Sequence, residues 1–296
     1  MCARAPSALL LSLILTLSPS PLLASQILLI TGGDTSNDSA LSSVLESQGN
    51  SVTVGPNYTN FTGSGLSGYN AAVLIPNGPG NSGDMPASGQ QALVDYVKNG
   101  GGLVTGEPVI SLWTYPGDFK TLAQVFPAQM GGANTSNSPL VFTAQSNDPV
   151  MTARLPSTFS FPTATGSDSE TYIFPTKSNS AISGATAFYS TNQWPITSVS
   201  YNSLLEAGAG IVGGSFGLGR VINMSTASDN TSLANSNYDQ LLVNSINWVT
   251  GSTAGTPQPF PPIPSPVPEP TTLAVFVFAA LGLTARSRLG RNSRAL

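Results

Sequence analysis

The sequence predicts an α/β fold, a three-layer sandwich in which helices cover a mainly parallel sheet that continues into a β-rich extension. Three observations predict it. Short apolar runs such as residues 26–31 end at glycines, as buried parallel strands do. Segments with apolar residues at helical spacing alternate with these runs as far as residue 106. The helical signal then disappears over residues 139–205, where Thr, Ser, Phe and Pro dominate.

The N-terminal half is expected to alternate strands with helices. One helix covers residues 39–48, and Leu41, Val44 and Leu45 recur in it at helical spacing. A second helix begins at an N-cap, Ser88, and ends at the three glycines from Gly100. The expected strands are residues 26–31, 51–54, 71–75 and 103–106.

The C-terminal half is expected to close the sheet with two strands and a helix. Residues 210–216 and 220–224 form strands around the turn at 217–219, and residues 239–249 form the last helix. The glycine-rich run at 210–219 lacks the Lys-Ser/Thr pair of a phosphate-binding loop. It therefore predicts a tight hairpin.

Composition limits the chemistry that this chain of 296 residues can perform. Charged residues make up 8% of it, histidine is absent, and the one cysteine is Cys2. Because Cys2 lies in a predicted leader, the mature chain has no thiolate nucleophile, no disulfide and no sulfur-ligated zinc site. Because histidine is absent, the chain also lacks the commonest general base and the commonest transition-metal ligand. No cofactor and no metal are predicted.

Basic residues are few in the expected domain, residues 26–251. Half of the ten basic residues lie in the terminal segments, whereas only Glu269 of the 14 acidic residues does. The domain is therefore acidic and has no basic stripe to neutralise a phosphate backbone. Nucleic-acid binding is excluded on this ground. The domain's basic residues are Lys98, Lys120, Arg154, Lys177 and Arg220.

Residues 1–25 predict a signal peptide. Arg4 precedes an apolar run at 8–17, and two prolines and the small residue Ala24 follow it. The export machinery is therefore an expected partner, and the domain is expected outside the cytoplasm.

The C-terminal end predicts a sorting tail in three parts. A proline-rich linker at 252–266 is expected to be extended and semi-rigid. The tail at 267–296 contains an apolar segment at 271–285, a single expected transmembrane segment. The motif before this segment is Val267, Pro268, Glu269 and Pro270, and the charges after it are Arg286, Arg288, Arg291 and Arg294.

This order resembles the PEP-CTERM sorting tail. The resemblance implies processing by an exosortase-type enzyme in a bacterium that makes exopolysaccharide. The arginines place the C-terminal end in the cytoplasm and the domain outside. The chain is thus expected in the inner membrane, transiently or permanently, and then in the cell envelope or outside the cell, with exopolysaccharide as a possible partner.

The middle of the chain resembles the ThuA-like branch of the class I glutamine amidotransferase-like fold, over most of residues 26–251. The resemblance implies an amidotransferase-like sandwich. It is carried by the order and spacing of several segments: residues 27–33, 93–105, 147–150, 155–156, 169–172, 217–221 and 247–251.

The same resemblance places Glu107 where the amidotransferases have their nucleophilic cysteine. A carboxylate cannot replace a thiolate, so the cysteine-dependent reactions of these relatives are excluded. The histidines that the ThuA-like branch often has are also missing. Asp34, Glu107 and Glu170 remain as candidate catalytic residues, as a hydrolytic carboxylate pair or as oxygen ligands of calcium.

A structural interpretation of these three residues stays open. Asp34 would cap a helix or turn a loop, Glu107 would accept backbone N–H bonds at a helix start, and Glu170 would pair with Arg220. The first functional hypothesis is accordingly a non-catalytic binding or structural module of the envelope or matrix. The alternatives are a carbohydrate-acting hydrolase that uses Glu107 with a second carboxylate, and a calcium-stabilised adhesion module.

Overall fold

The computed structural model describes residues 24–76, 83–114, 117–135, 139–163, 170–176, 182–192, 200–201, 204–205 and 208–251. All of them belong to the first of the two units into which the chain divides, residues 1–258. The predicted linker, sorting tail and transmembrane segment at 271–285 lie outside the described residues, as do residues 1–23 of the predicted signal peptide. Of the helices that are described, none has the length and apolar character needed to cross a bilayer.

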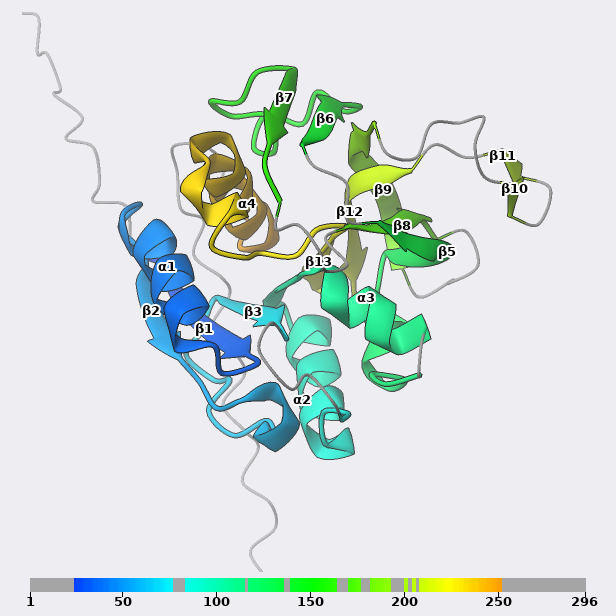
Figure 1. The fold of residues 1–296 in the computed structure, drawn as a ribbon. Helices are drawn as coiled ribbons and strands as arrows, with labels where there is room; N and C mark the ends of the chain where they lie inside the picture. Colours follow the sequence, from blue (N-terminus) through cyan, green and yellow to red (C-terminus); the bar gives the residue numbers. More distant parts are fainter. Residues whose placement is uncertain are drawn as a thin grey trace, which may run out of the picture. The chain divides into compact units, whose positions relative to one another are not determined.

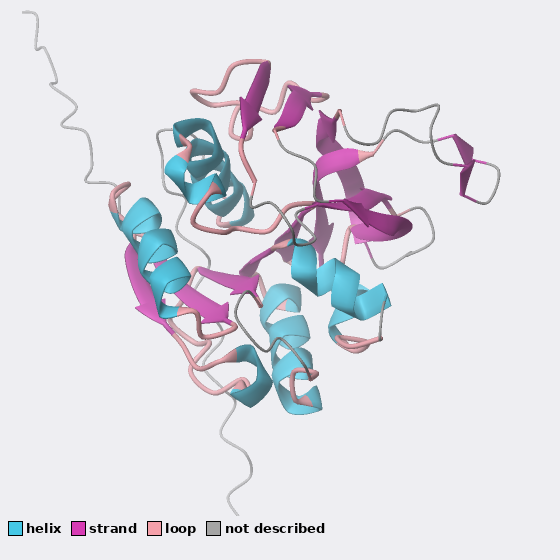
Figure 2. Cartoon of the chain, in the orientation of Figure 1, coloured by secondary structure: helices cyan, strands magenta, loops and turns pink. Residues whose placement is uncertain are grey.

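An eleven-stranded sheet organises the described residues (Figures 1 and 2). Its main path runs β2-β1-β3-β4-β13-β12-β9-β6-β7, and β8 pairs with both β12 and β5. Two short strands, β10 (Ser200–Tyr201) and β11 (Leu204–Leu205), pair only with each other. The strands of the large sheet are β1 (Gln26–Thr31), β2 (Ser51–Val54), β3 (Ala71–Ile75), β4 (Gly102–Thr105), β5 (Ala128–Thr135), β6 (Leu140–Ala144), β7 (Thr158–Phe161), β8 (Glu170–Pro175), β9 (Ile182–Thr191), β12 (Ala209–Phe216) and β13 (Gly219–Met224).

Strand direction divides the sheet into two parts. The strands from β2 to β13 along the main path pair in parallel, as the sequence predicts. The pairings of β12, β9, β6, β7, β8 and β5 are antiparallel. The expectation of a mainly parallel sheet therefore holds for one half, because the β12–β13 hairpin reverses the chain beside β4 and starts the antiparallel extension.

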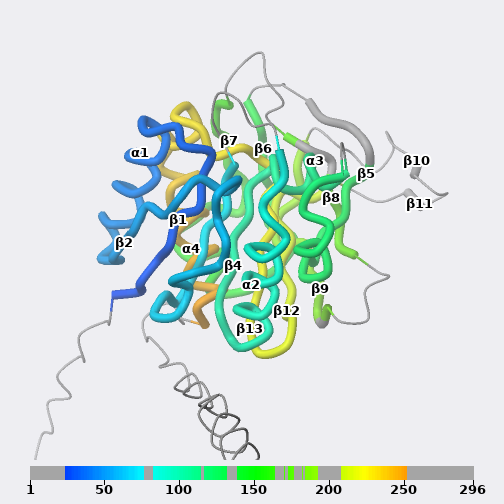
Figure 3. The backbone as a smooth tube through the Cα atoms, turned by 90° about the horizontal axis from the view of Figure 1, so that it is seen from below, coloured from blue at the N-terminus to red at the C-terminus, as the bar shows by residue number. Residues whose placement is uncertain are grey.

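Helices cover both faces of the sheet, which gives the predicted three layers. Alternate residues of one strand serve opposite faces: Ile27 and Leu29 pack with α1 and α4, whereas Leu28 and Ile30 pack with α2 and α3. Figure 1 shows these two pairs of helices on either side of the strands, and Figure 3 shows α2 in front of them. The helices are α1 (Thr35–Glu46), α2 (Ala87–Lys98), α3 (Glu107–Thr114) and α4 (Ser236–Val249), and the short 3₁₀ turns are η1 (Tyr58–Asn60), η2 (Leu122–Val125) and η3 (Ser232–Ala234).

Helix starts differ most from the prediction. The prediction of Ser88 as N-cap was wrong: Pro86 has the N-cap position, two residues earlier, and no side chain caps α2. α1 begins at Thr35 because Asp34 caps it, and α4 begins at Ser236 because Asn235 caps it. The sequence did not predict α3 or β5.

The glycine-rich run forms the predicted hairpin. Gly217 has a φ of 60°, in the left-handed region that glycine tolerates best. At Gly219 an added Cβ would meet the carbonyl oxygens of Val97 and Gly101 at 2.2 and 2.4 Å. The hairpin therefore packs against the end of α2 at backbone distance, and the two glycines have structural reasons to be there.

Gln90 joins α2 to the segment after α3. Its amide nitrogen donates to Asp84 Oδ1 and the Met85 carbonyl, both at 2.9 Å. Its Oε1 accepts from the N–H groups of Thr121 and Leu122 at 3.0 and 3.2 Å. The side chain is buried, so all four bonds are shielded from water.

Replacing Gln90 should therefore destabilise the domain. We expect Gln90→Ala to lower the free energy of unfolding by about 3 kcal/mol, because it leaves several buried polar groups without partners. Gln91→Ala is the matched control: Gln91 is exposed and bonds only Asp95, so we expect a change within about 0.5 kcal/mol. Urea unfolding of the full chain measures both. Equal effects of the two substitutions would contradict the role given to Gln90.

Candidate functional site

The candidate site lies at the carboxyl edge of the parallel strands. β1, β3, β4 and β13 are neighbours on the main path and parallel, so their carboxyl ends meet at one edge of the sheet. In open α/β sheets this edge is where ligands bind. Two of the three predicted candidates lie there together, and the third lies in the loop after β1.

Thr226 brings Glu107 and Glu170 to the same place. The Glu107 N–H donates to the Thr226 carbonyl at 2.9 Å, and Glu170 forms an isolated antiparallel bridge with Thr226. Thr226 follows β13, Glu107 follows β4, and Glu170 begins β8. Three segments that are far apart in the sequence are therefore fixed to one another at this edge.

Glu170 is fully buried and has an altered pKa. The Ser225 hydroxyl donates to its Oε1 at 3.0 Å, while Oε2 is buried without a hydrogen-bond partner. Burial raises the pKa of Glu170 from its ordinary value of 4.5 to about 8, although the hydroxyls of Thr191 and Ser225 oppose this shift. Glu170 is therefore a neutral carboxylic acid near pH 7.

Glu107 is the first residue of α3 and is 3% exposed. This is the strand-to-helix turn after β4, where the resemblance places a nucleophile. A carboxylate here lies at the positive end of the helix dipole. The Glu107 side chain is therefore part of the interior at this turn, which runs from Thr105 through Gly106.

Asp34 is not part of this group. Its Oδ1 accepts from the N–H groups of Ser36 and Asn37 at 3.0 and 3.2 Å and so caps α1. The capping interpretation of Asp34 is confirmed.

The proposed pairing of Glu170 with Arg220 was wrong. Arg220 lies at the opposite end of β13 from Ser225, the residue that Glu170 contacts. Its guanidinium lies over the Trp248 ring, 5.1 Å from the centroid, and donates to the Trp248 carbonyl at 3.0 Å. A six-residue strand separates the two sites, which a composition-based pairing could not reveal.

Tyr238 extends the buried polar network, and sequence reasoning missed it. Its hydroxyl lies 2.7 Å from Ser228 Oγ and 3.3 Å from Thr226 Oγ1. Asn37 in turn donates to the Ser228 carbonyl at 2.8 Å. The loop after β13 is thus tied to both α4 and α1. Among the many Ser, Thr and Asn residues of the chain, no local signal singles these out.

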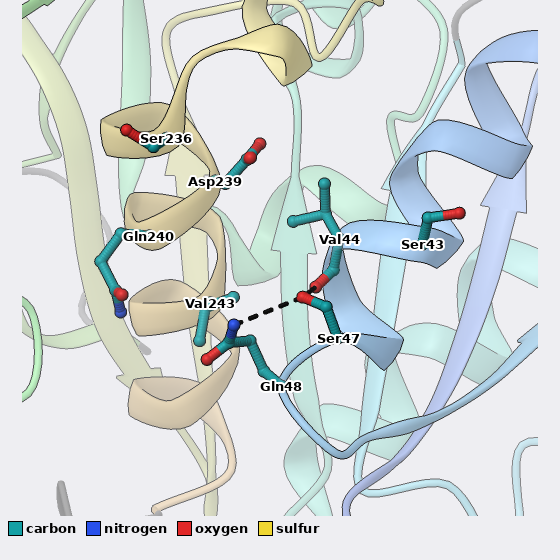
Figure 4. A pocket seen from close by; sticks show the side chains of 8 residues that line it. All are labelled: Ser43, Val44, Ser47, Gln48, Ser236, Asp239, Gln240 and Val243. Atoms are coloured by element: carbon teal, nitrogen blue, oxygen red, sulfur yellow. Dashed lines mark hydrogen bonds between the residues drawn. The ribbon is translucent and has the colours of Figure 1, made fainter.

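No metal centre is formed by the side chains that the structure describes: they contain no group of three or more His, Cys, Asp or Glu able to hold an ion. The calcium alternative therefore has no ligand cluster in this part of the chain. A pocket with a volume of about 420 Å³ does lie between α1 and α4 (Figure 4), and neither Glu107 nor Glu170 is among the residues that line it.

Comparisons with known proteins support the fold. No protein-family model and no curated protein sequence matches the chain. A cytoplasmic protein of Salmonella typhimurium LT2 has a similar structure, with a TM-score of 0.55 and 16% identity over 76% of this chain and 99% of that one. A ThuA-like protein of Bacteroides uniformis has a TM-score of 0.53 and 14% identity, over 80% and 96% of the two chains. At these identities the similarity concerns the fold alone, and it agrees with the ThuA-like resemblance of the middle domain.

The raised pKa of Glu170 predicts how stability depends on pH. The folded chain keeps the Glu170 proton up to about pH 8, whereas the unfolded chain releases it near 4.5, so stability falls as the pH rises between these values. We expect the free energy of unfolding of the parent to fall by up to roughly 2 kcal/mol between pH 6 and pH 8 because of this group. Glu170→Gln, which is neutral at every pH, should not show this part of the fall. Urea unfolding at several pH values measures it, with Glu46→Gln on the exposed surface of α1 as control. Identical pH slopes for the parent and Glu170→Gln would refute the burial argument.

Proposed function

We propose that the chain is an exported protein of the cell envelope or extracellular matrix, and that its α/β domain is a non-catalytic binding or structural module. The observation that carries this proposal is that the three candidate residues are held in the fold: Asp34 by capping a helix, Glu107 and Glu170 by burial. Asp34 caps α1, and Glu107 and Glu170 flank Thr226 in the interior. Residues placed in this way stabilise the edge of the sheet.

Burial argues against catalysis by these groups. A general acid or base must come within hydrogen-bond reach of its substrate. Glu170 is 0% exposed and Glu107 is 3% exposed, so neither side chain meets solvent to any extent. With no histidine in the chain, no other residue type supplies the usual base.

The two ends of the chain support the proposed location. The signal peptide predicted at residues 1–25 would direct export, and the PEP-CTERM-like tail at 267–296 would be recognised by an exosortase-type enzyme. The linker at 252–266 would hold the domain away from the membrane until the tail is cleaved.

A carbohydrate-acting hydrolase is the second candidate, and one observation favours it. Glu170, with a pKa near 8, is an acid at neutral pH, and Glu107 lies on the other side of Thr226. A protonated carboxylic acid with a second carboxylate is the arrangement that glycoside hydrolysis uses. Opening of the edge would be needed before a sugar could reach either group.

Polysaccharide binding and cleavage separate the two candidates. We expect the full chain to bind at least one of dextran, alginate and chitosan in a pull-down and to release no reducing ends from any of them. We also expect Glu107→Gln to bind as the parent does, because a buried residue at the start of α3 does not touch the polymer. Release of reducing ends that is abolished by Glu107→Gln would favour the hydrolase and overturn the non-catalytic assignment.

Tail processing tests the proposed location. Replacing Pro268, Glu269 and Pro270 together with alanine should leave the chain at full length in the membrane fraction, because the processing enzyme no longer recognises it. The parent should be shorter and found in the envelope or medium, as determined by mass spectrometry of its C-terminus. Pro262→Ala in the linker, outside the motif, is the control and should behave like the parent. Identical mass and location of the parent and the triple variant would contradict the sorting assignment.

A further inference from the structure

The pocket between α1 and α4 has the size of a small-molecule site. Its volume of about 420 Å³ lies within the range of ligand pockets, about 300–1,000 Å³. Three serines, two glutamines and Asp239 line it, with Val44 and Val243 as its apolar residues. Figure 4 shows Asp239 pointing from α4 toward α1, with the two valines between the helices and Gln48 near them. A pocket with such a polar lining suits a polar ligand.

Asp239 is the charged residue of this pocket, and it lacks a partner. Its Oδ1 is buried and makes no hydrogen bond. Burial alone raises the pKa of Asp239 to about 6, so the carboxylate is ionised at pH 7 in surroundings that hydrate it poorly. A cation or a strong donor at this position would remove that cost.

No basic residue of the described segments supplies this cation. Arg220 lies over Trp248, at the other end of α4, and Arg154 follows Ala153, whose carbonyl accepts from Asn244. Neither contributes to the pKa of Asp239. The other charged residues of the described segments on the elements around α4 are acidic: Asp38 of α1, Asp148, whose Oδ2 accepts from Trp248 Nε1 at 3.3 Å, and Asp229 before η3. Glu46 of α1 is exposed to solvent.

The remaining polar groups leave oxygens free for a ligand. The Gln48 amide nitrogen donates to Ser47 Oγ at 3.3 Å, and the Ser47 hydroxyl donates to the Val44 carbonyl at 2.7 Å. The Gln240 amide nitrogen donates to Asn244 Oδ1 at 2.8 Å. Each of these amide nitrogens uses one of its two N–H groups in this way, and the acceptors that the pocket offers are the Asp239 carboxylate and the amide oxygens of the two glutamines.

We propose that this pocket binds a small polar molecule that carries a primary ammonium group. The inference rests on the proposed binding function and names the ligand class and its place. The three N–H donors of an ammonium match one carboxylate and neighbouring neutral oxygens. The negative charge of Asp239 would repel anions. A metal ion such as calcium requires six to eight oxygen ligands, usually with several carboxylates. The acidic balance of residues 26–251 also attracts cations.

Glucosamine, glucose and N-acetylglucosamine form a matched set of probes, because they differ in whether an ammonium is present. We expect isothermal titration of the full chain at pH 7 to show binding of glucosamine only. Asp239→Asn keeps the shape of the side chain and should weaken this binding about tenfold or more, since it removes a charge-assisted hydrogen bond. Glu46→Gln is the matched control, because it removes a charge from the exposed surface of α1 and should leave the affinity unchanged.

The pH dependence provides a second readout. The affinity of the parent for glucosamine should fall as the pH drops through about 6, because Asp239 then takes up a proton, whereas Asp239→Asn should show no such fall. Equal binding of glucose, unchanged binding by Asp239→Asn, a response to calcium in place of glucosamine, or no binding of glucosamine would each overturn the inference. If the chain binds a polysaccharide while glucosamine fails, the inference falls and the proposed function stands. If nothing binds, the inference and the binding form of the proposed function both fall, and only a structural module remains.

Discussion

The hydrogen bond from the Glu107 N–H to the Thr226 carbonyl, 2.9 Å long, joins the end of β4 to the loop after β13. The rest of the carboxyl edge is arranged around it. Glu170, the first residue of β8, forms a bridge with Thr226. A strand of the antiparallel half of the sheet is therefore held at this edge too. Ser225 then bonds the Glu170 carboxyl, and Tyr238 ties the same loop to α4. The parallel and antiparallel halves, which the β12–β13 hairpin already joins, therefore also meet at Thr226.

This arrangement follows from a chain that has few charges and no cysteine in its domain. Its loops are held by neutral side chains that bond backbone groups, as with Gln90 at α2 and Asn37 at Ser228. Such bonds are strong only when water is excluded. Glu107 and Glu170 are buried at the same edge, where their backbones contact Thr226. The residues that line the pocket between α1 and α4 include neither Glu107 nor Glu170.

Patterns in the sequence predicted the parallel strands, because buried runs such as Ile27–Ile30 in β1 are apolar and are soon followed by glycines. They also predicted the β12–β13 hairpin, since Gly217 and Gly219 meet demands that only glycine satisfies. α3 was missed because its residues after Pro108 are apolar without a clear polar face, which does not distinguish a helix from a strand. The antiparallel strand order depends on tertiary contacts such as Glu170 with Thr226, which no local pattern encodes. The candidate carboxylates were predicted by residue number, but their burial, which decides their role, is a property of the folded chain.

The central claim is that the carboxyl edge is a rigid structural junction, and amide hydrogen exchange of the full chain tests it most directly. The Glu107 and Ser225 amides, which donate to the Thr226 and Gly210 carbonyls, report on the edge itself. They should exchange only through global unfolding, as slowly as the amides of β4 and β13. Exchange of these two amides through local opening, orders of magnitude faster than that of the central strands, would show an edge that opens to admit a substrate and would contradict the account.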